Sequence, residues 1–179
     1  AAIAEKYLDQ YLKKEQPLCI RFQDLDVEAI HDALVQFQVI RTVPGTGKQR
    51  FSPIITFLEQ ADTEEHPIIL VSKFHELLRR QYGKKMISAA SKLMWLRQQG
   101  DIIIIDALAK KALRCPSDVE YNIYAAKWVS AYKSFKPQIK AGIDAIQNNK
   151  HKHIVESEWF SKRVFDLLLW SIGKEGKTL

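Results

Sequence analysis

The sequence has little of what identifies a secreted, membrane-spanning or zinc-binding protein. Its 179 residues include only two cysteines, Cys19 and Cys115, which lie far apart and form no CxxC pair, so neither a disulfide framework nor a zinc site is indicated. The longest apolar run is Ile102 to Ile105, far short of the roughly 20 residues that cross a bilayer. The N-terminus has no apolar signal-peptide core. We therefore expect a soluble, cytoplasmic protein that has no membrane partner.

The common signatures of hydrolases and metalloenzymes are also missing, since GxSxG, HExxH, EF-hand and deaminase-type His/Cys patterns do not occur. The glycine loop at residues 45–48 is not a Walker A loop, because Thr42 and Gln49 occupy positions that need Gly and Ser or Thr. His151 and His153 are separated by one residue, and no carboxylate or cysteine is predicted nearby to complete a metal site. The pair therefore indicates a surface loop. We expect neither a metal nor a cofactor.

Helical periodicity dominates the chain and predicts an all-α fold, a single globular bundle of about eight or nine helices in one domain over residues 1–179. Residues 16–23 are expected to be an extended linker and residues 41–50 a Pro/Gly loop. The helices are expected at about residues 3–14, 27–37, 52–60, 73–82, 86–99, 107–114, 118–134, 136–149 and 158–173.

Side chains that favour helix ends set most of these boundaries. The expected N-terminal caps are Asp26, Ser72, Asp106, the capping box from Ser117 to Glu120, and Ser157. The expected helix ends are Gly83, Gly100 and Gly173. Four aromatic residues, Tyr121, Tyr124, Trp128 and Tyr132, share one helical face. The second half of the last helix is apolar nearly all round, so we expect it to be buried, and the four tryptophans are interpreted as core residues.

The segment from Asp101 to Asp106 contains the four isoleucines and has two readings, a short buried strand or an extended lead-in to a helix. No second β-branched run is present to pair with it. We therefore favour the extended lead-in, after which Asp106 would cap the next helix.

The positive charge is concentrated in one stretch of sequence. Between Arg79 and Arg114 there are nine basic residues against Asp101 and Asp106, a net charge of +7, which leaves −1 for the rest of the chain. Such a stretch suits a polyanion, because each phosphate neutralised by Lys or Arg releases counterions. A solvated helical face that keeps the protein soluble explains it as well, and both interpretations stay open.

Within this stretch, the order of elements resembles the helix–hairpin–helix DNA glycosylase superfamily, especially its oxoguanine-glycosylase-like bacterial branch. In that superfamily a glycine turn opens a helix of small residues, and about 20 residues later an apolar run delivers an essential aspartate at the start of another helix. Gly83 matches the turn and Asp106 matches the aspartate. The resemblance covers roughly residues 70–172.

The resemblance implies a DNA-binding hydrolase in which Asp106 is the catalytic carboxylate. The implied reaction is cleavage of the N-glycosidic bond of a modified base that is flipped out of the duplex, either in base repair or in defence against phage DNA. The expected DNA contacts are Lys84, Lys85, Lys92, Lys110, Lys111 and Arg114. Bifunctional members carry a Schiff-base lysine where counting back from Asp106 gives Ile87 or Ser88, so a monofunctional reaction is implied.

Two alternatives remain beside this hypothesis. Asp106 can be a plain helix cap, worth about 1 kcal/mol, in a non-catalytic helical module that binds DNA phosphates through its basic residues. The basic face can instead meet an acidic protein partner. Steep salt dependence of DNA affinity separates both DNA-binding hypotheses from the last one.

Overall fold

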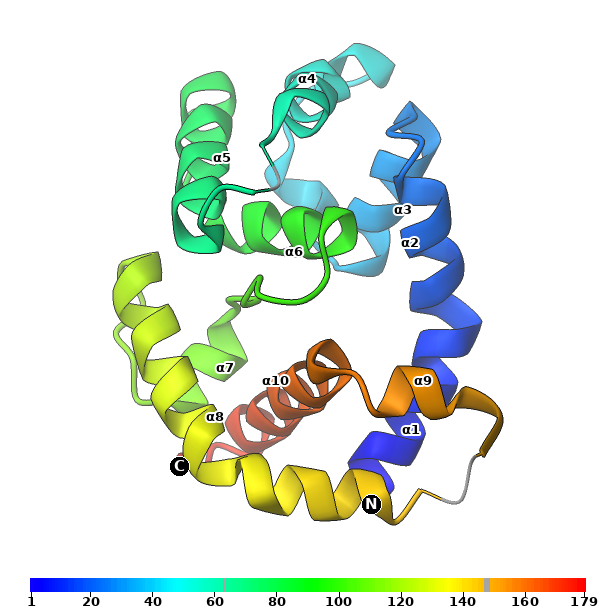
Figure 1. Ribbon diagram of the computed structural model, residues 1–179. Coiled ribbons are helices and arrows are strands. Elements are labelled where there is room, and N and C mark those ends of the chain that lie inside the picture. Colours follow the sequence, from blue (N-terminus) through cyan, green and yellow to red (C-terminus); the bar gives the residue numbers. More distant parts are fainter. Residues whose placement is uncertain (63, 147–148) are drawn as a thin grey trace. The chain divides into compact units, whose positions relative to one another are not determined.

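The computed structural model describes residues 1–62, 64–146 and 149–179, and within these residues the regular structure is helical, with no β-strand (Figure 1). The all-α class is therefore confirmed. The chain forms two compact units: unit 1 contains residues 1–14 and 105–179, and unit 2 contains residues 15–104. The description of residues 1–179 as one domain stays a prediction.

Unit 2 has α6 (Ile87–Arg97) at its centre, packed against α2, α3 and α5. Ala89, Ala90 and Ser91 of α6 and its Leu, Met and Trp side chains are buried. α4 also packs against α5, through Phe57 and Phe74, whose ring centroids are 4.4 Å apart. The bounds of these helices are α2 (Gln16–Phe22), α3 (Val27–Gln36), α4 (Ser52–Gln60) and α5 (Pro67–Tyr82).

Unit 1 is organised around α10 (Glu158–Lys174), which packs against the other α-helices of this unit (Figure 1). Aromatic pairs form its core: Tyr7 lies 5.2 Å from Phe160 between ring centroids, and Trp128 meets Phe165 edge-on at 5.1 Å. The bounds of the other helices are α1 (Ala2–Gln10), α7 (Ala107–Ala112), α8 (Tyr121–Asp144) and α9 (Lys152–Val155).

Three of the predicted helix caps are confirmed by their hydrogen bonds. Asp26 Oδ1 accepts from the backbone N–H of Ala29 at 2.6 Å, and Ser157 Oγ accepts from Phe160 N–H at 3.3 Å. Asp106 caps α7 in the same way. The segment before Asp106 has no regular secondary structure, so the extended lead-in is also confirmed.

The predicted linker at residues 16–23 is wrong, because α2 occupies it. Pro17 lies in the first turn of α2, where its missing N–H costs nothing and its fixed φ suits a helix. A π-helical turn, Tyr11–Glu15, joins α1 to α2, so helical structure runs from Ala2 to Phe22.

The cap predicted at Ser72 is also wrong, since α5 already begins at Pro67. His66 precedes it, and its Nδ1 accepts a hydrogen bond from Ile68 N–H at 3.3 Å. Ser72 lies inside the helix, where its hydroxyl donates to the Ile68 carbonyl at 2.7 Å. A serine hydroxyl can bond the carbonyl four residues back, so it does not by itself indicate a helix start.

The two helices predicted at 118–134 and 136–149 are one helix, α8. It begins at Tyr121 after Glu120, with no side-chain capping bond, so the Ser117 capping box does not form. It also continues through Pro137, an interior proline that removes one backbone hydrogen bond. Residues 147 and 148, near the predicted end of the second helix, lie outside the described part of the chain.

Three smaller predictions also need correction. The 41–50 loop contains short 3₁₀ turns, Ile40–Thr42 and the start of Lys48–Phe51, and His151 and His153 lie in short helical turns. The second half of α10 is not buried all round, because Trp170 is exposed.

Of the helices in the described ranges, none has the length and apolar character needed to span a bilayer.

Candidate functional site

Asp106 is the N-cap of α7, at the end of the apolar run. All four isoleucines before it are buried, and the aspartate itself is half-buried. Its Oδ1 accepts a hydrogen bond from Ala109 N–H at 2.9 Å. The described residues give Oδ2 no hydrogen bond. One carboxylate oxygen therefore caps the helix, while the other is able to accept from water or a substrate.

A buried polar cluster of unit 1 lies beside Asp106. Asp166, on α10, accepts a hydrogen bond from Trp128 Nε1 at 2.7 Å, and Arg163 Nη1 lies 3.9 Å from its other oxygen. Burial raises the pKa of the Tyr124 phenol well above its ordinary value, and the carboxylates of Asp166 and Asp106 raise it further. Tyr124 thus remains protonated next to two carboxylates.

Sequence reasoning did not identify Asp166. The only signal was an aspartate within the apolar sequence FDLLLW, since a charged residue in a buried helix needs a partner. Its partner Trp128 is 38 residues away in sequence, so no local pattern indicates the pair.

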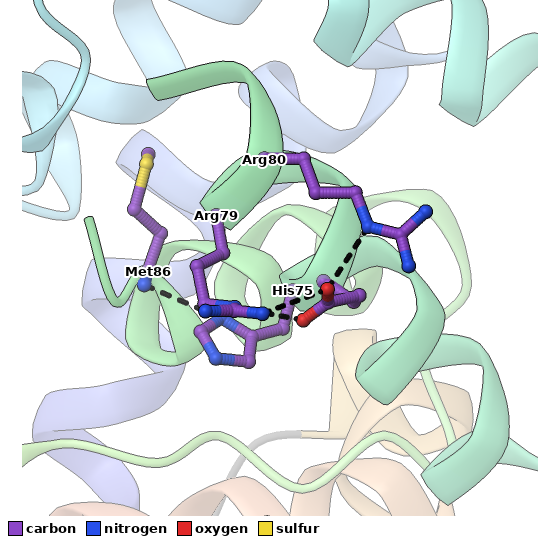
Figure 2. A network of polar contacts seen from close by, with 5 residues as sticks. His75, Arg79, Arg80 and Met86 are labelled. Atoms are coloured by element: carbon purple, nitrogen blue, oxygen red, sulfur yellow. Dashed lines mark hydrogen bonds and ion pairs between the residues drawn. The ribbon is translucent and has the colours of Figure 1, made fainter. Parts of the chain in front are cut away.

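The helix–turn–helix that precedes the apolar run is formed by α5 and α6, which pack against each other. Gly83 ends α5 with φ 68°, a left-handed conformation that favours glycine, and its N–H donates to the Arg79 carbonyl at 2.9 Å. His75 Nδ1 accepts from Met86 N–H at 3.3 Å, which fastens the turn to α5 (Figure 2). The predicted glycine turn therefore has defined hydrogen bonds on both sides.

The cations at the end of α5 are partly neutralised. Glu76 accepts hydrogen bonds from Arg79 at 2.8 and 3.0 Å and from Arg80 at 2.9 Å (Figure 2). The bonds from Arg79 and Arg80 lower the pKa of Glu76 to about 2. Because Glu76 lies outside the Arg79–Arg114 stretch, the sequence count of +7 did not include it.

The lysines predicted to contact DNA from unit 2 differ in their surroundings. Lys84 and Lys85 are exposed at the turn, and the described residues give neither ammonium group a hydrogen bond or an ion pair. Lys92, on α6, is half-buried. Its Nζ donates to the Phe37 carbonyl at 3.3 Å and lies 6.0 Å from the centre of the Phe37 ring. Lys92 is therefore engaged in packing within unit 2.

The cations predicted in unit 1 follow Asp106 directly. Lys110 is half-buried and donates to the Ser117 carbonyl, whereas Lys111 is exposed. Arg114 is exposed, and its Nε donates to Thr178 Oγ1 at 3.0 Å. Of these three, Lys111 and Arg114 present their charge to solvent.

The positive charge divides differently in space than in sequence. Unit 2 contains 11 basic and 11 acidic residues, a net charge of zero, whereas unit 1 contains 16 basic and 10 acidic residues, a net charge of +6. The whole excess therefore lies on unit 1, including lysines of α8 and α10 that the sequence count passed over. Lys84, Lys85 and Lys92 lie in a unit that is neutral as a whole.

The structure brings Asp106, Lys110, Lys111 and Arg114 together on α7 and the turn that follows it, whereas the other predicted DNA contacts belong to unit 2. Across the described residues, no group of three or more His, Cys, Asp or Glu side chains is arranged to hold a metal ion.

Comparison with known proteins gives no relative: the chain matches no protein-family model, no curated protein and no solved structure.

Proposed function

We propose that this protein is a monofunctional DNA glycosylase of the helix–hairpin–helix type, with Asp106 as its catalytic carboxylate. One observation carries the proposal: a glycine turn between two packed helices is followed by a buried apolar run and then by a half-buried aspartate that caps a helix. This is the order of elements on which the resemblance rests, and hydrogen bonds hold both the glycine turn and the aspartate.

The position of Asp106 suits the chemistry of N-glycosidic bond cleavage. As the bond to the base breaks, positive charge develops on the sugar, and a nearby carboxylate stabilises that charge and orients the attacking water. The bond from Ala109 N–H to Oδ1 fixes the direction of the carboxylate. In this proposal Oδ2 faces the reacting centre and accepts the hydrogen bond from water.

The cations of unit 1 supply the attraction for DNA. Contacts from Lys and Arg to phosphate oxygens fix the register of a protein on a duplex and make its affinity depend on salt. Lys111 and Arg114 lie five and eight residues after Asp106 and are exposed, so phosphates bound there flank the catalytic carboxylate. Lys84 and Lys85, exposed on the turn before α6, are the DNA contacts proposed for unit 2.

A second function, a non-catalytic DNA-binding module, is favoured by the same hydrogen bond. The bond from Ala109 N–H explains an aspartate at position 106 without any reaction, because a capping side chain stabilises a helix by about 1 kcal/mol. The charge of unit 1 then provides binding alone.

The test is base release from duplexes that each contain one modified base, followed by alkali to break the strand at abasic sites. We expect strand breaks with the native protein and none with Asp106→Asn, because asparagine caps a helix as well as aspartate but lacks the charge. Asp26→Asn is the matched control, since Asp26 caps α3 with the same type of bond. Duplex binding without strand breaks for any base would instead establish the non-catalytic module.

A further inference from the structure

Trp170 is an exposed aromatic side chain, whereas many other aromatic rings of the chain are buried. Its exposed fraction is 41%, against 1% for Trp128 and 2% for Trp95. It lies near the end of α10. An indole at the surface has a flat apolar face that water solvates poorly, and such rings commonly serve as contact sites.

The surroundings of Trp170 are basic. Lys174 lies one turn later on the same side of α10, with its Nζ 5.0 Å from the centre of the Trp170 ring. Gly173, three residues after Trp170, faces α7 so closely that a Cβ there would lie 2.1 Å from the Leu108 carbonyl oxygen. Lys111 reaches the end of α10 as well, because a Cβ at Gly176 would lie 3.9 Å from its Nζ. The end of α10 that carries Trp170 and Lys174 is therefore the end that contacts α7.

The segment after α10 lies against the end of α7, close to Arg114. Leu179 N–H donates to the Ala112 carbonyl at 2.9 Å, and Thr178 accepts the bond from Arg114. The last turn of α10 and the last turn of α7 thus share one end of unit 1. We call Trp170, Lys174, Lys111 and Arg114 the Trp170 surface.

The backbone at Arg114 has a conformation that glycine adopts without strain. Its φ is 51°, in the left-handed region that glycine adopts readily just after a helix. Leu25 and Gln38 have the same type of backbone, with φ of 52° and 57°. The Arg114 guanidinium group, on the outside of unit 1, is suited to a phosphate.

We propose that the Trp170 surface binds a single-stranded segment of DNA, with one base stacked on the Trp170 indole and neighbouring phosphates held by Lys174, Lys111 and Arg114. Exposed aromatic rings within a basic surface are how proteins bind single strands without reading their sequence. A duplex hides the faces of its bases, so stacking requires an unpaired one. This inference rests on the proposed function in that DNA is the ligand, and it adds a stacked, unpaired base beside the phosphates that Lys111 and Arg114 bind.

The test compares the affinity of variants for oligothymidylate and for an abasic oligonucleotide with the same number of phosphates, by fluorescence anisotropy. We expect Trp170→Ala to weaken oligothymidylate binding by about tenfold and to leave abasic binding unchanged. Trp170→Phe should retain most of the affinity because it keeps an aromatic face. Ile123→Ala, which removes an exposed apolar side chain of the same unit, is the matched control and should bind like the native protein.

Arg114→Gly tests one phosphate contact without destabilising the fold. We expect this variant to unfold at the same or a higher temperature, since glycine suits the left-handed backbone. It should lower the salt dependence of log affinity by about one phosphate contact.

The proposal would be overturned if Trp170→Ala bound oligothymidylate as tightly as the native protein, or if it lost equal affinity for both oligonucleotides. Full competition by polyglutamate would also overturn it. Polyglutamate competition would indicate an acidic protein partner. Failure of the proposed function is separate: if Asp106→Asn releases bases normally, the glycosylase proposal fails, whereas the Trp170 result still decides this one.

Discussion

Replacing Gly173 with alanine tests how α10 holds the helix that begins at Asp106. The new Cβ would lie 2.1 Å from the Leu108 carbonyl oxygen and 2.8 Å from its carbon, whereas a C···O contact needs about 3.3 Å. The two helices must therefore separate by about 1 Å. Overpacking costs about 1–3 kcal/mol, and we expect the upper end because the obstacle is backbone.

The intrinsic preference of alanine for helices opposes this loss by about 1 kcal/mol. The net fall in the free energy of unfolding is therefore about 2 kcal/mol, or about 4–8 °C in Tm for a chain of this size. The rate of base release should also fall, by more than the loss of folded protein accounts for. A displacement of about 1 Å at a catalytic group can lower the rate about a hundredfold.

Thermal and urea unfolding, followed by circular dichroism and tryptophan fluorescence, measure this effect. Gly142→Ala is the control, because it is also a helical glycine of unit 1, and its Cβ would lie 3.0 Å from the Ala1 nitrogen, a contact that needs only a small shift. We expect its stability to change by less than about 1 kcal/mol. A Gly173→Ala protein as stable as the native one would refute the close contact between α10 and α7.

Three further predictions concern named side chains. Trp128→Phe removes the hydrogen bond to Asp166 and should lower the free energy of unfolding by about 1–3 kcal/mol in urea titrations, whereas an unchanged value would mean that the bond contributes nothing. The stability of the native protein should fall as the pH drops below about 6.5, the ordinary pKa of histidine, because His75 is held neutral in the fold. Borohydride should trap no covalent DNA adduct on Lys84 or Lys85, and an adduct detected by mass spectrometry would contradict the monofunctional reaction.

The sign of the pH effect follows from the burial of His75. Burial lowers its pKa, with Glu76 opposing and Arg79 and Lys85 adding to the decrease. The folded protein therefore binds fewer protons than the unfolded chain near this pH. The stabilisation of the fold by neutral His75 is complete above about pH 6.5, the ordinary pKa of histidine. It is lost as the pH falls through the lowered pKa of His75. His75→Asn keeps an acceptor near the Nδ1 position but does not titrate, so its stability should vary less with pH, and an unchanged pH profile would exclude His75 as the cause.

Features determined by a few neighbouring residues could be predicted from the sequence. The caps at Asp26, Asp106 and Ser157 each need one side chain and an N–H three residues later. The end of α5 at Gly83 needs only a residue that tolerates positive φ. The position of the candidate aspartate was predictable for the same local reason.

Features that depend on distant residues could not be predicted. Pro137 usually ends a helix, yet α8 continues through it with Tyr132 and Ile139 buried on either side. Trp170 belongs to an apolar sequence, but its exposure depends on which neighbours pack beside it. The charge count between Arg79 and Arg114 crossed the boundary between the two units, which only the folded chain defines.

Base release by Asp106→Asn tests the central claim most directly. It is measured by alkali-dependent strand breaks in duplexes with one modified base each, beside Asp26→Asn and the native protein at equal amounts of bound DNA. The account predicts breaks with the native protein and with Asp26→Asn, and none with Asp106→Asn. Breaks at the native rate with Asp106→Asn would contradict a catalytic role for this carboxylate.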